Sequence, residues 1–386
     1  MTLIHSRPKS VGVDDPELLF KEARRRRQRR WLISGTVLTV VAVVIALVSA
    51  LGSSTGTRAI RIRPPRSVPP QAVGLPTGGV QSLVSAGPLA VNATGSLFVV
   101  DEGRHEVLVR LTNGRFRVVA GNGTSGFAGD GGPATNAELS DVTDVTFGPN
   151  GDLYLADNGR VRVIDPQGVI ETIAGAGNGG GPVTTGAPAG SPSSVSQIAS
   201  VAVSPSGVIY AATPNRIYRV ATAHQLQPIT AIGNTVDTTG IGYAPAPINS
   251  FGQIAVDSQG NIYASSDDIG WSIYKITPDG TATHIGAARG TGGTLADVQL
   301  GPGDAAYAGD GSDVVRAEGD QLVPFHIFDL RGPRQFFYMQ YFSFSPNGVL
   351  YADNIGESAF SKYQKIVSFD HGKTTELWRR RVRGQR

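Results

Sequence analysis

The chain has 386 residues, of which 40% are hydrophobic, 17% are charged and 74 are Gly or Pro. The low charge excludes a coiled coil, and so many helix breakers, without a three-residue period, exclude a mainly helical protein and collagen. The charge is unevenly placed, because residues 1–66 hold 13 Lys and Arg against 4 Asp and Glu, whereas residues 67–378 hold 16 against 27. An acidic body repels a phosphate backbone, so we expect no nucleic-acid partner.

Residues 31–51 predict a transmembrane helix. They carry no charge, and a helix of this length spans about 31 Å, which matches the hydrocarbon core of a bilayer. Residues 16–30 contain seven Lys and Arg, against four in residues 52–66. The positive-inside rule therefore places residues 1–30 in the cytoplasm as a basic tail and the rest outside. We expect a single-pass protein of the cell membrane with an uncleaved signal-anchor.

Two other interpretations apply to this segment. A cleaved signal peptide is one, with Val48, Ser49 and Ala50 as the cleavage site, but the apolar run is longer than the usual h-region and many residues precede it. The other is helix pairing. Ala42, Ala46 and Ala50 form a stripe of small residues on which two such helices could pair. Alanine is common in membrane helices, so we take this stripe as ordinary composition.

Residues 52–78 are rich in Gly, Ser and Pro and have no sustained hydrophobic period. They predict a partly stiff spacer between the membrane and a folded domain. Residues 58–63 (RAIRIR) could instead form a short strand, which matters for how that domain closes.

One pattern recurs six times between residues 79 and 378. An apolar strand is followed by a tight turn with Gly and by a second strand that carries an aromatic residue, as in DVTFGPNGDLYLADNG. The aligned glycines are Gly95, Gly151, Gly207, Gly260, Gly303 and Gly348, spaced by 56, 56, 53, 43 and 45 residues. In the fifth copy the turn reads as one residue longer. Periods of this size with four short strands are typical of propeller blades, so we predict an all-β, six-bladed β-propeller.

The aromatic residue recurs at one place in every copy. It is Phe98, Tyr154, Tyr210, Tyr263, Tyr307 and Tyr351 in turn. A large ring at one fixed place is what packing between neighbouring blades requires. The last copy contains enough sequence (KIVSFD, then TTELW) for its own fourth strand, and the alternative is that residues 58–63 close the ring.

These copies resemble NHL-repeat β-propellers, most strongly along VVAGNGTSGFAGDGGPATNAELSDVTDVTFGPNGDLYLADNG. That family includes the outer sensor domains of some membrane-anchored bacterial Ser/Thr kinases. The resemblance implies the fold and a bacterial, extracytoplasmic setting, but no single function, because a common fold hosts many activities. A cytoplasmic part of 30 residues leaves no room for the kinase of those relatives.

The position three residues after each aromatic is polar: Asp101, Asp157, Thr213, Ser266, Asp310 and Asn354. A ring of carboxylates could hold Ca²⁺, the one cofactor that we regard as possible. Thr and Ser in two copies favour a structural role instead, in which each side chain accepts a backbone N–H two residues on and fixes a turn.

Binding residues are expected where long connections meet, because function tends to lie on loops held by a rigid scaffold. The turns between strands one and two are tight. We therefore predict that a ligand binds on the opposite face, at the mouth of the central channel. The candidates are Asp267, Asp268 and Trp271, which could grip a sugar or a cationic ligand, and Asp130 in the Gly-rich stretch GFAGDGG. That stretch lacks the strand, helix and Lys of a phosphate-binding loop.

No catalytic or metal-binding motif stands out. The six histidines are scattered and no GxSxG is present. The chain has no cysteine, which excludes disulfides and thiol chemistry. Residues 379–386 (RRRVRGQR) predict a solvated basic tail.

We therefore expect a membrane-anchored, extracytoplasmic propeller that binds a ligand, a protein or an envelope glycan without catalysis. The alternative is a metal-dependent propeller enzyme of the lactone hydrolase or lyase type, with its site in the central channel. A receptor that signals through the short basic tail is a third hypothesis.

Overall fold

The computed structural model describes residues 78–175, 198–214, 216–221, 225–229, 235–236, 246–247, 251–266, 272–287, 297–309, 314–319, 321–325, 339–355, 363–371 and 373–381. All of them belong to one compact unit, Ser67–Arg386. The predicted anchor (31–51) and residues 52–77 of the spacer lie outside the described residues. Within the described ranges, no helix is long and apolar enough to cross a membrane.

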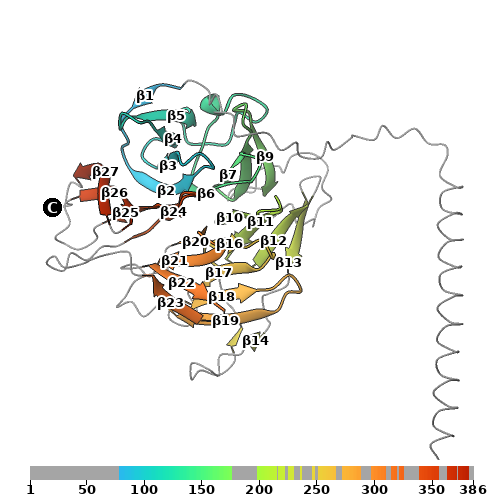
Figure 1. Ribbon diagram of the computed structural model, residues 1–386. Coiled ribbons are helices and arrows are strands. Elements are labelled where there is room, and N and C mark those ends of the chain that lie inside the picture. Colours follow the sequence, from blue (N-terminus) through green and yellow to red (C-terminus); the bar gives the residue numbers. More distant parts are fainter. Residues whose placement is uncertain are drawn as a thin grey trace, which may run out of the picture. The chain divides into compact units, whose positions relative to one another are not determined.

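Six of the antiparallel sheets in the described ranges are blades, each built from one sequence copy (Figure 1). Within a blade, consecutive strands pair with each other. Blade one contains β2 (Ala86–Val91), β3 (Leu97–Asp101), β4 (Glu106–Arg110) and β5 (Phe116–Ala120); blade two contains β6 (Val142–Phe147), β7 (Leu153–Asp157), β8 (Arg160–Ile164) and β9 (Ile170–Gly175); blade three contains β10 (Ser200–Val203), β11 (Ile209–Thr213), β12 (Arg216–Ala221) and β13 (Gln225–Ile229).

The second half of the chain repeats the plan. Blade four contains β16 (Ile254–Val256), β17 (Ile262–Ser266), β18 (Ser272–Ile276) and β19 (Ala282–Ala287); blade five contains β20 (Val298–Gly301), β21 (Ala305–Gly309), β22 (Val314–Glu318) and β23 (Gln321–Phe325); blade six contains β24 (Phe342–Phe344), β25 (Leu350–Ile355), β26 (Tyr363–Asp370) and β27 (Lys373–Arg381). The first strand of each blade contacts that of the next, and β24 contacts β2. The predicted six-bladed β-propeller is therefore confirmed.

The turn between the first two strands has the same length in all six blades. In each one, five residues separate an equivalent pair of opposed residues, as between Val203 and Ile209 or between Leu300 and Ala306. The six aligned glycines all have a positive φ, between 76° and 88°. This left-handed backbone costs a glycine little, which explains why the residue recurs at this point of the pattern.

The expectation of a longer turn in the fifth copy is wrong. Register places Asp304, not Gly303, at the position of the other glycines, and Asp304 itself has φ +61°. Asp tolerates the left-handed region better than most residues. The sequence alignment was therefore off by one residue in this copy.

The hydrophobic core is divided into six clusters, each shared by two neighbouring blades. The recurring aromatics lie in these clusters, as predicted. Phe98 of blade one meets Phe147 of blade two edge-on, with ring centroids 4.8 Å apart, and Tyr307 of blade five meets Phe344 of blade six at 4.6 Å. Each blade is thus stabilised by apolar contacts on both of its faces.

The ring closes through blade six, whose fourth strand is the chain's own β27. This strand runs to Arg381, so the first three arginines of the expected basic tail are part of it. An extra strand, β1 (Val80–Gln81), extends blade one beyond β5. A short hairpin, β14 (Thr235–Val236) with β15 (Ala246–Pro247), and a 3₁₀ turn, η1 (Ala134–Asn136), lie in connections between blades.

Candidate functional site

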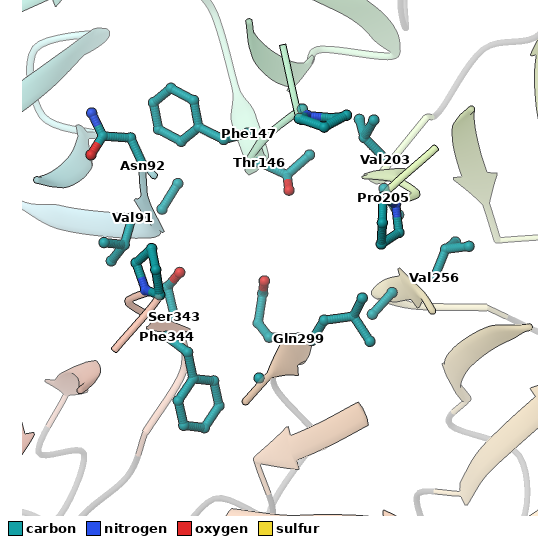
Figure 2. Close-up of a pocket in the computed structure, with 18 of the residues that line it drawn as sticks. Val91, Asn92, Thr146, Phe147, Val203, Pro205, Val256, Gln299, Ser343 and Phe344 are labelled. Carbon is teal, nitrogen blue, oxygen red and sulfur yellow. The ribbon is translucent and has the colours of Figure 1, made fainter. Parts of the chain in front are cut away.

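A cavity of about 470 Å³ lies on the axis of the propeller, where the six inner strands end. Every blade contributes to its wall, through the last residues of the inner strand, and five of the six also through the turn that follows. Figure 2 shows these side chains surrounding an open centre. The six-fold repetition explains the cavity, because the same point of each repeat reaches the same height on the axis.

The wall of this cavity carries no charge. Every residue that lines it belongs to the described part of the chain, and none is Asp, Glu, His, Lys, Arg or Tyr. Thr146, Gln299 and Ser343 point toward the centre, whereas Val91, Val203 and Val256 point away from it and pack in the clusters between blades (Figure 2). Such a wall fits apolar groups and a few neutral hydrogen-bonding partners.

The rim of the cavity is stiff. Four of the six turns place a proline there, each exposed to solvent: Pro149, Pro205, Pro302 and Pro346. Proline fixes φ, so this rim loses little conformational entropy when something binds on it.

The start of each inner strand contributes to a second ring. One residue per blade lies seven positions before the left-handed turn residue: Pro88, Asp144, Ser200, Gln253, Asp297 and Tyr341. Two of them, Asp144 and Asp297, are buried carboxyls at 6% and 2% exposure. We call the five members other than Pro88 the polar ring. The sequence analysis did not identify this ring. Its members share one position, seven residues before the turn residue, but this becomes visible only when the fifth copy is aligned on Asp304.

The polar ring ties neighbouring blades together. Asp144 of blade two accepts the Ser200 hydroxyl at 2.7 Å and the Val201 N–H at 2.9 Å, both from blade three. The Ser200 oxygen in turn accepts the Ile254 N–H of blade four at 3.1 Å. Burial raises the pKa of Asp144 to about 6, although these hydrogen bonds favour its ionised form.

Asp297 links blade five to blade six and to the cavity. Its Oδ2 accepts the Phe342 N–H at 3.0 Å, and its Oδ1 accepts the side-chain amide of Gln299, also at 3.0 Å. Gln299 itself lines the cavity. Burial, and then the nearby charge of Asp144, raise the pKa of Asp297 to about 7.

A third buried carboxyl, Asp353, lies next to this ring. Its Oδ1 accepts the N–H groups of Gln340 and Tyr341, at 3.1 and 2.7 Å, and its Oδ2 is buried without a hydrogen-bond partner. Burial raises its pKa well above the ordinary value. The pKa of Tyr341 is raised by burial and by surrounding carboxylates, the nearest in effect being Glu102 and then Asp353.

Three of the residues predicted to fix turns form side-chain hydrogen bonds to the backbone. Asp101 accepts the N–H groups of Val84 and Ser85, ahead of the first strand, not two residues on. Asp157 likewise accepts the Ser140 N–H at 2.9 Å. In both blades the first strand has a bulge. Thr213 bonds the N–H and carbonyl of Arg216, across a tight turn.

In the regular blades four and six, the equivalent contact comes one residue earlier. Ser265 accepts the Gln253 N–H at 2.9 Å and Asp353 accepts those of Gln340 and Tyr341. Ser266 is buried, and the side chain of Asn354 lies outside what the structure describes, so the turn-fixing role of these two residues stays a prediction. Without a bulge in the first strand, the register between the first two strands differs by one residue. Asp310 lies outside the described residues.

Asp130 has a different partner from the one expected. Its Oδ1 lies 2.8 Å from the guanidinium of Arg162, and it does not line the cavity. Arg162 is fully buried and also donates to Asp157 and to the carbonyls of Glu138 and Ala128. It thereby holds the connection of residues 121–141 on blade two.

Asp267, Asp268 and Trp271 lie outside the described residues, and so do Ala42, Ala46 and Ala50. The binding role expected of the long-connection face therefore stays a prediction, and the axial cavity lies at the other end of the inner strands, among the tight turns. Over the ranges that the structure describes, no three His, Asp or Glu side chains are grouped as metal ligands.

No protein-family model matches this chain. Among solved structures it is similar to virginiamycin B lyase from Staphylococcus aureus, with 14% identity, 77% of this chain and 87% of that chain covered, and a TM-score of 0.48. It is also similar to a streptogramin B lyase (10%, 80% and 88%, 0.49) and to a gluconolactonase from Xanthomonas campestris (14%, 71% and 84%, 0.46). Identities this low concern the fold alone.

Proposed function

We propose that this chain is a membrane-anchored, extracytoplasmic, NHL-like propeller that binds an uncharged ligand in its axial cavity without transforming it. The uncharged wall of the cavity is the observation that carries the proposal. The apolar segment 31–51, with its basic flank, supports the anchor, and the six repeats support the likeness to NHL propellers.

The lining selects against charge. An ion that enters this cavity meets hydroxyl and amide groups but no side chain of opposite charge, so it gains little to offset the water that it gives up. A neutral amide, hydroxyl or ether loses less and can bond the side chains of Thr146, Gln299 and Ser343. A volume of about 470 Å³ is within the range of small-molecule sites. A neutral segment of an envelope glycan or of a protein has the required chemistry.

The same lining supports a binding role over a catalytic one. Acid–base or nucleophilic catalysis needs a titratable group in reach of the ligand. The buried carboxyls Asp144 and Asp297 are hydrogen-bonded between blades and are not part of the cavity wall.

Three fragments of equal size test this proposal: 4-(trifluoromethyl)benzamide, the benzoate and the benzylammonium ion. We expect ¹⁹F NMR to detect binding of the benzamide to the full chain in nanodiscs, and much weaker binding of the two ions. The variant Thr146→Trp fills the cavity and should abolish benzamide binding.

Thr112→Trp is the matched control, because Thr112 is exposed in the turn between β4 and β5 and does not line the cavity. This variant should bind as wild type does, which also corrects for fragments dissolved in the lipid. Equal binding of all three fragments, or unchanged binding by Thr146→Trp, would refute the proposal.

A further inference from the structure

Gln299 connects the cavity to a buried titratable group. It is part of the cavity wall, and Figure 2 shows its side chain reaching toward the open centre. Its Nε2 donates to Oδ1 of Asp297 at 3.0 Å, and Asp297 is only 2% exposed. The amide therefore has one side committed to the carboxyl and the other side free to meet a ligand.

The protonation state of Asp297 decides which side of the amide is committed. An ionised carboxylate only accepts hydrogen bonds, so it takes the NH₂ group of Gln299 and leaves the amide oxygen for the cavity. A protonated carboxyl has one O–H to donate. Its Oδ2 already accepts the Phe342 N–H, so the proton sits on Oδ1 and points at Gln299. The amide then turns over, accepts this O–H with its oxygen and presents its NH₂ group to the cavity.

We propose that Gln299 is a specificity-determining residue whose polarity toward the cavity is inverted by protonation of Asp297. With the carboxylate ionised, the cavity favours ligands that donate a hydrogen bond at this point. With the carboxyl protonated, it favours ligands that accept one. This inference rests on the proposed function, because it assumes that a ligand occupies the cavity.

The surroundings of Asp297 place the change near neutral pH. The titratable groups that face it come from two other blades: Asp144 from β6, Asp353 from β25 and Tyr341 just before β24. Burial and the charge of Asp144 raise the pKa of Asp297, whereas the bonds from Phe342 and Gln299 lower it, with a balance at about 7. Both states are therefore populated at ordinary pH.

The switch itself is tested without any ligand. The full chain, labelled with ¹⁵N in its glutamine side chains, is titrated by NMR, and the Gln299 signals are assigned by their loss in Gln299→Met. We expect one transition of these signals near neutral pH. In Asp297→Asn the introduced side-chain amide acts as a permanent donor, so the signals should match the low-pH spectrum at every pH.

Asp144→Asn is the matched control, since it is equally buried and keeps its acceptor oxygen for Ser200 and Val201. It should preserve the Gln299 transition but move it to lower pH, because the charge of Asp144 raises the pKa of Asp297. Gln299 signals that do not titrate in wild type, or an unmoved transition in Asp144→Asn, would overturn the switch, even if Asp297→Asn fails to fold.

Two uncharged probes then test the consequence for binding. Indole donates but does not accept at its nitrogen, and camphor accepts but does not donate. From pH 6 to pH 8 we expect indole to bind about 2- to 10-fold more tightly and camphor to bind correspondingly more weakly, as one neutral hydrogen bond is gained or lost. Neither affinity should depend on pH in Asp297→Asn. If neither probe binds while the Gln299 transition is present, the proposed function fails and the switch stands. If both bind with no pH dependence, the switch fails alone.

Discussion

Arg162 is the residue whose replacement should destabilise the propeller most clearly. In Arg162→Met, the fully buried guanidinium is lost together with its bonds to the carbonyl of Glu138 (2.6 Å), to Asp157 (3.2 Å) and to Asp130 (2.8 Å). The carboxyl of Asp157 is 1% exposed, and in the variant it stays buried without the positive charge of Arg162.

The expected cost is about 3–5 kcal/mol, which is typical of breaking one side of a buried ion pair. Most of it comes from Asp157, because Asp130 is 35% exposed and its pair is screened by solvent. For a domain of this size such a loss lowers Tm by about 6–15 °C. Arg160→Met, on the same strand, should cost less, about 1 kcal/mol: Arg160 is also buried, but its guanidinium lies over the ring of the exposed Phe127 and acts on Asp157 more weakly than Arg162 does.

Urea unfolding at pH 5 and pH 8 checks this reasoning. Burial raises the pKa of Asp157 and Arg162 lowers it, so the pKa rises further in the variant. A buried acid with a raised pKa is more stable when protonated, so the cost of Arg162→Met should be larger at pH 8 than at pH 5. Adding Asp157→Asn should recover part of the loss. A cost below about 1 kcal/mol, or the same cost at both pH values, would refute the account.

Other predictions concern stability, metal and topology. Burial raises the pKa of Asp144 to about 6, so its folded form retains a proton that the unfolded chain has already released. Its contribution to the free energy of unfolding should fall by up to about 3 kcal/mol between pH 4 and pH 6, and Asp144→Asn should remove this part of the decline in urea titrations. Gly175→Ala should lower the free energy of unfolding by about 3 kcal/mol, because residue 175 has φ +85° and an added Cβ would lie 2.3 Å from the Gly159 carbonyl oxygen. Gly303→Ala is the control: it has open space around it and should lower the same quantity by only about 1 kcal/mol. Chelator should leave the Tm of the full chain unchanged; a stoichiometric divalent ion in metal analysis would favour the enzyme alternative instead. Tags placed before residue 1 and after residue 386 should be protected from and accessible to external protease, respectively, and the reverse result would exclude the proposed topology.

Local signals made the fold predictable. The left-handed turn glycine and the period-two strands depend on a few neighbouring residues, and they recur often enough to reveal six blades. The aromatic position, Phe98 and its equivalents, also predicted the packing between blades, because one large ring at a fixed place in each repeat contacts the neighbouring sheet. The fifth copy was misaligned for a physical reason, since Asp304 adopts a backbone that glycine usually provides.

The candidate site was less predictable because it is built from contacts between repeats. Asp144 acts on Val201 and Asp297 acts on Phe342, each in the following blade. Their raised pKa values arise from burial, which no spacing in the sequence reports. Which residue of the second strand binds the backbone ahead of the first, Asp101 in blade one or Asp353 in blade six, depends likewise on whether the inner strand contains a bulge, and this is decided by pairing in three dimensions.

The last blade holds the first one by a side chain near the very end of the chain. Gln364 donates to the Ala86 carbonyl at 2.7 Å and accepts the Ala86 N–H at 3.3 Å, across 278 residues of sequence. Without blade six this contact cannot form, and the apolar face of blade one that packs against Ile366 would be uncovered. Loss of Gln364 should therefore loosen the contact between the last and the first blade, although the two are far apart in sequence.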